Sequence, residues 1–171
     1  MFVRSIFAAM LGCAILLTPI ATYAADRGPS TPEERKLALE NIHEWQAEPL
    51  GPHAKDQFGW VLKWLVDVPD ITVHACILLD KLPKGDKKDA STIFGGQFMG
   101  QAAFVIENPD RNDDKLAEYQ AGMEGALRVY ELLLNGNPKD REPYLDDLIQ
   151  RREVGTLAQF VKERAAASCG K

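Results

Sequence analysis

Three histidines are the side chains best suited to acid–base chemistry or metal binding, but none lies in a recognisable motif. His43 precedes Glu44, the order found in zinc peptidases, yet no second histidine completes an HExxH spacing. His53 lies among proline and glycine residues, and His74 is two residues from Cys76, a poor spacing for two ligands on one helix face. The sequence therefore predicts no metal ion and no cofactor; a zinc site assembled from distant parts of the chain is the alternative.

Catalysis by a nucleophile would need a nucleophile, a base and oxyanion donors together, and no motif supplies them. No serine lies in a nucleophile elbow, and the glycines of residues 95–100 do not match a phosphate-binding loop. The paired acids at 113–114 and 146–147 are typical of helix ends and surfaces. These patterns favour a non-enzymatic role over a catalytic one.

Gln97 and Gln101 are the polar residues of greatest interest, because they alone interrupt the apolar stretch of residues 92–107. Four residues apart, they lie on one side of a helix, where buried amides need hydrogen-bond partners. They can bond to the end of a neighbouring helix, or line a small-ligand pocket between helices. The second interpretation makes them the candidate ligand-binding residues.

The chain begins with the pattern of a cleavable secretory signal peptide. Arg4 precedes an apolar stretch over residues 6–17, Pro19 ends that stretch, and small residues then predict cleavage after Ala24. The stretch is shorter than the ~20 residues that a membrane-spanning helix needs. The alternatives are an uncleaved anchor or a lipid on Cys13, although a lipidated cysteine should end the apolar run rather than lie within it.

Cleavage would divide the chain into a signal peptide of residues 1–24, a polar leader of residues 25–30 and one domain of residues 31–171. The protein would then work in the periplasm or outside the cell. The formal net charge is −5 at pH 7, and no cluster of basic residues is present. This charge argues against nucleic acid and anionic membranes as partners, and we expect no stable membrane insertion after cleavage.

Two cysteines, Cys76 and Cys169, remain after cleavage. In an oxidising compartment they most simply form one disulfide, which would tie the end of the chain to its middle. A loop of that length stabilises a fold by roughly 4–5 kcal/mol in the chain-entropy model. The alternative is a buried thiol at Cys76 and a free thiol in the tail.

Helical periodicity with clear start and stop signals predicts an all-α fold, a single helical bundle of about six to seven helices. A hydroxyl residue before Pro32 and acids after it mark the first start. The expected helical segments lie within residues 32–48, 55–67, 70–82, 92–107, 113–135, 144–149 and 157–165.

The segment of residues 70–82 is ambiguous. Its apolar residues fit a helical stripe, with Asp70 as a cap, but Ile71, Val73 and Ala75 also begin an alternation typical of a strand that continues to Leu79. Its length and its lack of turn residues favour a helix. The strand remains the alternative.

Two further patterns concern packing and recognition. Gly96 and Gly100, followed by Ala103, form a stripe of small residues, so we expect residues 92–107 to be a central helix that a second backbone approaches closely. Trp60 and Trp64 form an aromatic face beside the core stripe of their helix. They are the candidate surface for a protein partner.

Gly96, Gly100 and Cys169 resemble features of small periplasmic immunity proteins of type VI secretion, which are exported helical domains with a glycine-spaced apolar helix and a cysteine near the C-terminus. This chain departs from them because no cysteine closely precedes the glycine helix, which puts their disulfide pattern in doubt. The resemblance implies an immunity-type role, beside the alternative of an envelope-stress protein.

Together these patterns predict an exported helical protein that is non-enzymatic and acts by binding another protein. Its partner would be another envelope protein, or a second copy of itself in a homodimer. A small-ligand-binding or enzymatic domain with its pocket near Gln97 and Gln101 is the competing hypothesis.

Overall fold

Six α-helices account for most of residues 27–82 and 88–169, which are the residues that the computed structural model describes. Within these ranges the chain contains no strand, so the expected all-α helical bundle is confirmed. The helices are α1 (Pro32–Ala47), α2 (Ala54–Asp67), α3 (Lys88–Glu107), α4 (Lys115–Gly136), α5 (Pro143–Glu153) and α6 (Leu157–Ser168). Two short 3-10 turns, Pro109–Arg111 and Pro138–Asp140, follow α3 and α4.

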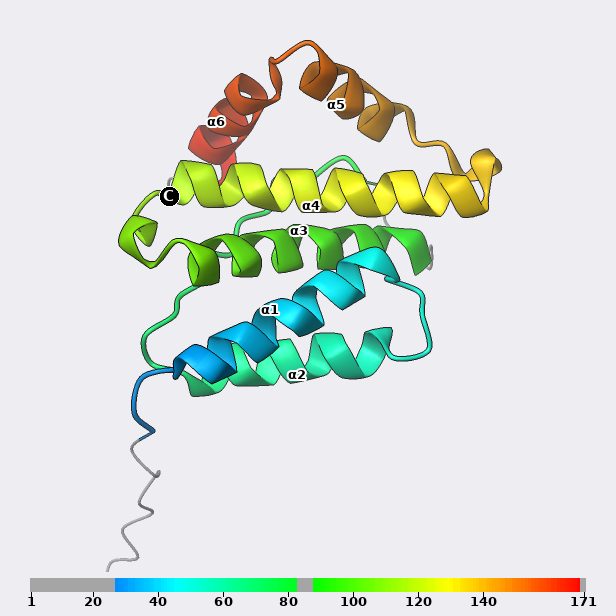
Figure 1. Cartoon of the computed structure of the whole chain (residues 1–171). Coiled ribbons are helices and arrows are strands. Elements are labelled where there is room, and N and C mark those ends of the chain that lie inside the picture. Colours follow the sequence, from blue (N-terminus) through cyan, green and yellow to red (C-terminus); the bar gives the residue numbers. More distant parts are fainter. Residues whose placement is uncertain (1–26, 83–87, 170–171) are drawn as a thin grey trace, which may run out of the picture.

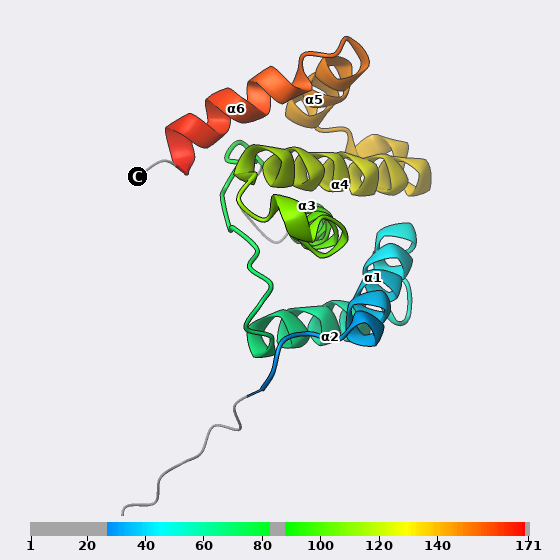
Figure 2. The ribbon, with the colours of Figure 1, turned by 60° about the vertical axis from the view of Figure 1, so that its left-hand side comes forward.

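The helices are arranged as three layers (Figures 1 and 2). The α3–α4 pair forms the middle layer, the α1–α2 hairpin covers one side of it, and α5 with α6 covers the other. The middle layer is the most deeply buried, with Met99, Ala102, Met123, Ala126 and Leu127 all fully enclosed. Residues 92–107 belong to α3, so the segment expected to be the central helix lies in the middle layer.

The predicted signal peptide of residues 1–24, with its cleavage after Ala24, lies outside the residues that the structure describes. The end of the predicted leader packs against the domain. Arg27 pairs with Glu34 of α1 at 2.5 Å, and Ser30 is buried against Asp70, which accepts hydrogen bonds from both its N–H and its hydroxyl group.

The first helix begins as its sequence predicts. Thr31 accepts a hydrogen bond from the N–H of Glu34 at 3.1 Å, and the Glu34 carboxylate accepts one from the N–H of Thr31 at 2.9 Å. This reciprocal capping box satisfies two backbone donors that the helix itself leaves unpaired.

Glycines on both helices bring α3 and α4 into close contact. A Cβ atom on Gly96 would lie 2.8 Å from the carbonyl oxygen of Gly125, and one on Gly100 would collide with the carbonyl oxygen of Ala121. A Cβ atom on Gly122 would lie 2.6 Å from Cγ of Gln101. The expectation that a second backbone approaches the glycine stripe is confirmed, and α4 is that second backbone.

The prediction of a helix over residues 70–82 is wrong. Residues 71–79 form neither helix nor strand but an extended segment, which Figure 2 shows running from the end of α2, past α3, towards α4 and α6. Asp70 caps no helix there, because its carboxylate is bonded to Ser30 and Arg35. We call residues 71–79 the extended segment. The alternation of apolar residues in this segment therefore reflects a single extended chain whose neighbours are helices rather than strands.

Candidate binding site on the extended segment

Two glutamine side chains of α3 bond to the backbone of the extended segment. Gln101 Nε2 donates to the carbonyl oxygen of His74 at 2.9 Å, and Gln97 Nε2 donates to that of Cys76 at 2.8 Å. Four helical residues rise ~6 Å and two extended residues ~6.6 Å, so the two amides match two carbonyls in register. The two glutamines thus take the place of a neighbouring strand.

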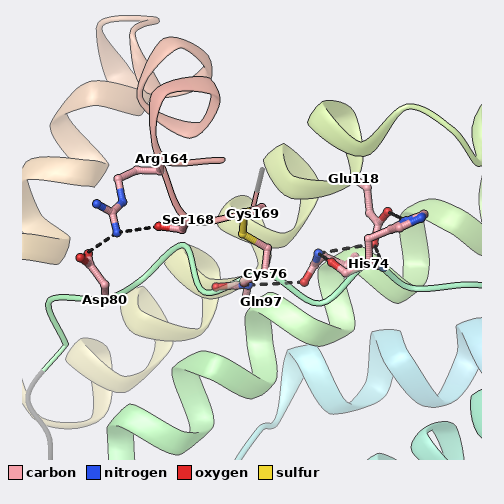
Figure 3. The surroundings of a disulfide bond; sticks show 9 residues. His74, Cys76, Asp80, Gln97, Glu118, Arg164, Ser168 and Cys169 are labelled. Carbon is pink, nitrogen blue, oxygen red and sulfur yellow. Dashed lines mark hydrogen bonds and ion pairs between the residues drawn. A yellow bond between two sulfur atoms is a disulfide. The ribbon is translucent and has the colours of Figure 1, made fainter. Parts of the chain in front are cut away.

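Glu118 of α4 completes this set of bonds. Its carboxylate accepts a hydrogen bond from the N–H of His74 at 2.6 Å, and its second oxygen lies 2.7 Å from Nδ1 of the same residue (Figure 3). Gln101 Nε2 also reaches it at 3.4 Å. Glu118 is almost wholly enclosed; burial raises the pKa of this carboxyl above its ordinary value, and the hydrogen bonds from His74 oppose the rise.

Sequence reasoning missed Glu118. It lies in the first turn of α4, where an acid is ordinarily explained by the helix dipole. The signal that could have found it is its spacing: Glu118 precedes Gly122 by four residues and Gly125 by seven. It therefore lies on the same stripe of small residues that faces α3.

A disulfide ties the extended segment to the C-terminus. Cys76 and Cys169 are bonded, with a Cα–Cα distance of 5.6 Å and a sequence separation of 93 (Figure 3). The predicted pairing is therefore present in the structure. It attaches the end of α6 to the residue whose carbonyl oxygen Gln97 holds.

A groove lies beside this disulfide, between the extended segment, α3 and α6. Gln97 and Gln101 both line it, so the two candidate ligand-binding residues are brought together at a hollow of the surface. Their amide nitrogens are already bonded to the extended segment, whereas Gln97 Oε1 is buried and has no hydrogen-bond partner among the residues that the structure describes.

The groove has an apolar part and a charged end. Its apolar walls are made by Ala75 and Ile77 of the extended segment and by Phe94 and Phe98 of α3. At the other end Arg164 pairs with Asp80 at 2.7 Å and lies 3.4 Å from the hydroxyl of Ser168 (Figure 3). A surface of this kind suits an amphipathic partner better than a small charged ligand.

The two tryptophans lie elsewhere. Trp60 and Trp64 stack on α2 with ring centroids 6.1 Å apart, and neither lines the groove. Trp60 is 36% exposed but Trp64 only 5%, so Trp60 is the one that reaches the surface.

The other two histidines belong to different elements and do not line the groove. His43 faces Glu107 at 3.6 Å on the exposed side of α1, and His53 precedes α2. Over residues 27–82 and 88–169 no three His, Cys, Asp or Glu side chains are grouped closely enough to hold a metal ion. Within the same ranges no helix has both the length and the apolar character needed to cross a membrane.

Comparison with protein-family models, curated proteins and solved structures finds no match to this chain.

Proposed function

We propose that this protein is exported to the periplasm or the cell exterior, where it acts by binding another protein. Two features support export. The first is the signal-peptide pattern before Ala25, and the second is the Cys76–Cys169 disulfide, a bond that persists in oxidising compartments.

The observation that carries the binding role is the exposed apolar surface at the groove. Ile77 is 66% exposed and Phe94 38%, and both line the same hollow. Grouped apolar and aromatic side chains at a concave surface are typical of protein-binding sites. The exposed Leu62 and Val66 of α2 are four residues apart and share one helix face, but they support a binding surface less well because neither lines the groove.

A catalytic role has weaker support. Glu118 orients the ring of His74 much as a carboxylate orients a catalytic imidazole. The neighbouring Cys76 is bonded to Cys169, however, and so supplies no thiolate. The side-chain amides of Gln97 and Gln101 likewise donate to carbonyl groups of the chain itself rather than to a ligand.

Photocrosslinking in living cells tests the proposed function. Phe94 is replaced by the photoreactive analogue p-benzoylphenylalanine, which keeps an aromatic ring in the groove. Val154, 66% exposed at the end of α5 and not part of the groove, is the matched control position. Irradiation should join the Phe94 variant to a discrete envelope protein, and the Val154 variant should give no such product.

Two results would contradict this proposal. One is the same set of crosslinked products from both positions, because the groove would then have no special role. The other is an intact N-terminus on a protein recovered from the cytoplasm, since an exported protein should begin at Ala25.

A further inference from the structure

The extended segment has two backbone edges, and its hydrogen bonds occupy one of them. In an extended chain the N–H and C=O groups of one residue point to the same side, and those of the next residue to the opposite side. His74 receives partners at both its N–H and its C=O. The C=O of Cys76 accepts from Gln97 and, in a tight turn about Ile77, from the N–H of Leu78 at 3.1 Å. The alternate residues Val73, Ala75 and Ile77 therefore direct their backbone groups away from the glutamines.

This outer edge is open. No hydrogen bond from elsewhere in residues 27–82 and 88–169 reaches the N–H or C=O groups of Val73, Ala75 or Ile77. Ala75 and Ile77 are exposed, and Val73 is half-buried. Unpaired N–H and C=O groups in an extended row are the groups with which another extended chain pairs.

The open edge is also held in shape before any partner arrives. Gln97, Gln101 and Glu118 fix the inner edge, and the disulfide fixes Cys76 to α6. Binding of a partner to the edge therefore costs little conformational entropy in this segment, and such preorganisation raises affinity.

We propose that the outer edge at Val73, Ala75 and Ile77 binds an extended polypeptide segment of a partner protein by strand addition. The backbone of that segment bonds to the edge, and its alternate apolar side chains lie against Phe94 and Phe98 in the groove. This inference rests on the proposed function and specifies the chemistry of the partner.

The surroundings of the edge favour a single extended chain over a second copy of the protein. Ala75 and Ile77 belong to a groove whose other walls come from α3 and α6. In a second copy of the protein the same edge is flanked by its own α3 and α6. Two such edges therefore approach each other less readily than one edge and a free extended segment do. The occupant is therefore a linear segment with apolar residues at alternate positions and no proline among its bonded residues.

A displayed library of random linear peptides, selected on the disulfide-bonded protein, provides the probe. Ala75→Pro removes the outward N–H and leaves the inward groups of His74 and Cys76 in place, and proline also keeps its preceding residue extended. Ala75→Val is the matched control, because it keeps that N–H. Selected peptides should bind the valine variant within about threefold of the original protein and the proline variant at least about tenfold more weakly.

A second measurement applies to the unmodified protein and does not depend on how the proline variant folds. A selected peptide is synthesised with N-methyl groups on alternate residues, in each of the two registers. One register should lose binding and the other keep it, because only every second amide of an added strand faces the edge. Equal binding by both registers would overturn the proposal.

Other results would also overturn it. These are a library that yields no binder, peptides that bind the Ala75→Pro variant as tightly as the control, or a stable dimer that Ala75→Pro dissociates. If Phe94 crosslinks to a partner that leaves amide exchange at Val73 and Ala75 unchanged, strand addition fails and the proposed function stands. If peptides bind this edge but no crosslinked partner forms in cells, the edge stands and the proposed function fails.

Discussion

Replacing Gln101 by methionine should destabilise the fold far more than its conservative size suggests. Methionine keeps an unbranched side chain of similar length beside Gly122 but donates no hydrogen bond. The carbonyl oxygen of His74 then loses its 2.9 Å bond, and the buried carboxylate of Glu118 loses its 3.4 Å contact. Leaving a buried acceptor unpaired costs ~1–3 kcal/mol. In a protein of this size each kcal/mol lowers the melting temperature by about 2–4 °C.

Urea denaturation of the disulfide-bonded protein, followed by circular dichroism, measures this cost. Gln150→Met is the matched control, because Gln150 is exposed on α5, and its effect should stay within ~0.5 kcal/mol. Gln97→Met should cost less than Gln101→Met. The carbonyl oxygen of Cys76 keeps its 3.1 Å bond from the N–H of Leu78, and Gln97 Oε1 has no described partner to lose. Equal free energies of unfolding for the Gln101 and Gln150 variants would refute the view that α3 holds the extended segment.

Three further changes test other parts of the structure. Cys169→Ser should lower the free energy of unfolding by about 4–5 kcal/mol in urea titrations, because the disulfide no longer restricts the entropy of the unfolded chain. A loss no larger than that of a surface substitution would count against the disulfide. Gly100→Ala should lower the free energy of unfolding by ~1–3 kcal/mol, because its Cβ atom meets the backbone of Ala121. The control Gly136→Ala places its Cβ atom in open space and should raise the free energy of unfolding by up to about 1 kcal/mol. Thermal melts in which both variants behave alike would contradict the close packing of α3 and α4. Burial alone would raise the pKa of Asp70, but its hydrogen bonds lower the pKa below the ordinary value, so the stability it contributes is present above about pH 4 and is lost as the pH falls through the lowered pKa. The difference in melting temperature between the original protein and Asp70→Asn, measured across pH, should therefore shrink on acidification. A difference that widens on acidification would contradict this assignment.

Local signals explain which parts of the fold could be predicted from the sequence. The start of α1 depends on Thr31, Pro32 and Glu34, which are close in the chain and act on the same helix end. The tight packing of α3 follows from the spacing of Gly96 and Gly100 on its own surface. The disulfide follows from counting the two cysteines that remain after the predicted cleavage.

The extended segment could not be predicted in this way, because its conformation depends on distant residues. Its apolar residues fit both a helix and a strand, and neither periodicity decides between them. The groups that hold it extended are Gln97, Gln101 and Glu118, between 21 and 44 residues further along the chain. The sequence marks the glutamine pair as unusual and predicts a helix end as its partner, but the structure shows that the partner is the backbone of the extended segment.

Amide hydrogen exchange, resolved by residue with NMR, tests most directly the claim that this protein presents one open backbone edge. In the free protein the N–H of His74, bonded to buried Glu118, should exchange slowly, while those of Val73 and Ala75 exchange nearly as fast as in an unfolded chain. A selected peptide should slow exchange at Val73 and Ala75 and leave His74 unchanged. Equal protection of all three amides in the free protein would contradict the account, because the edge would already be covered.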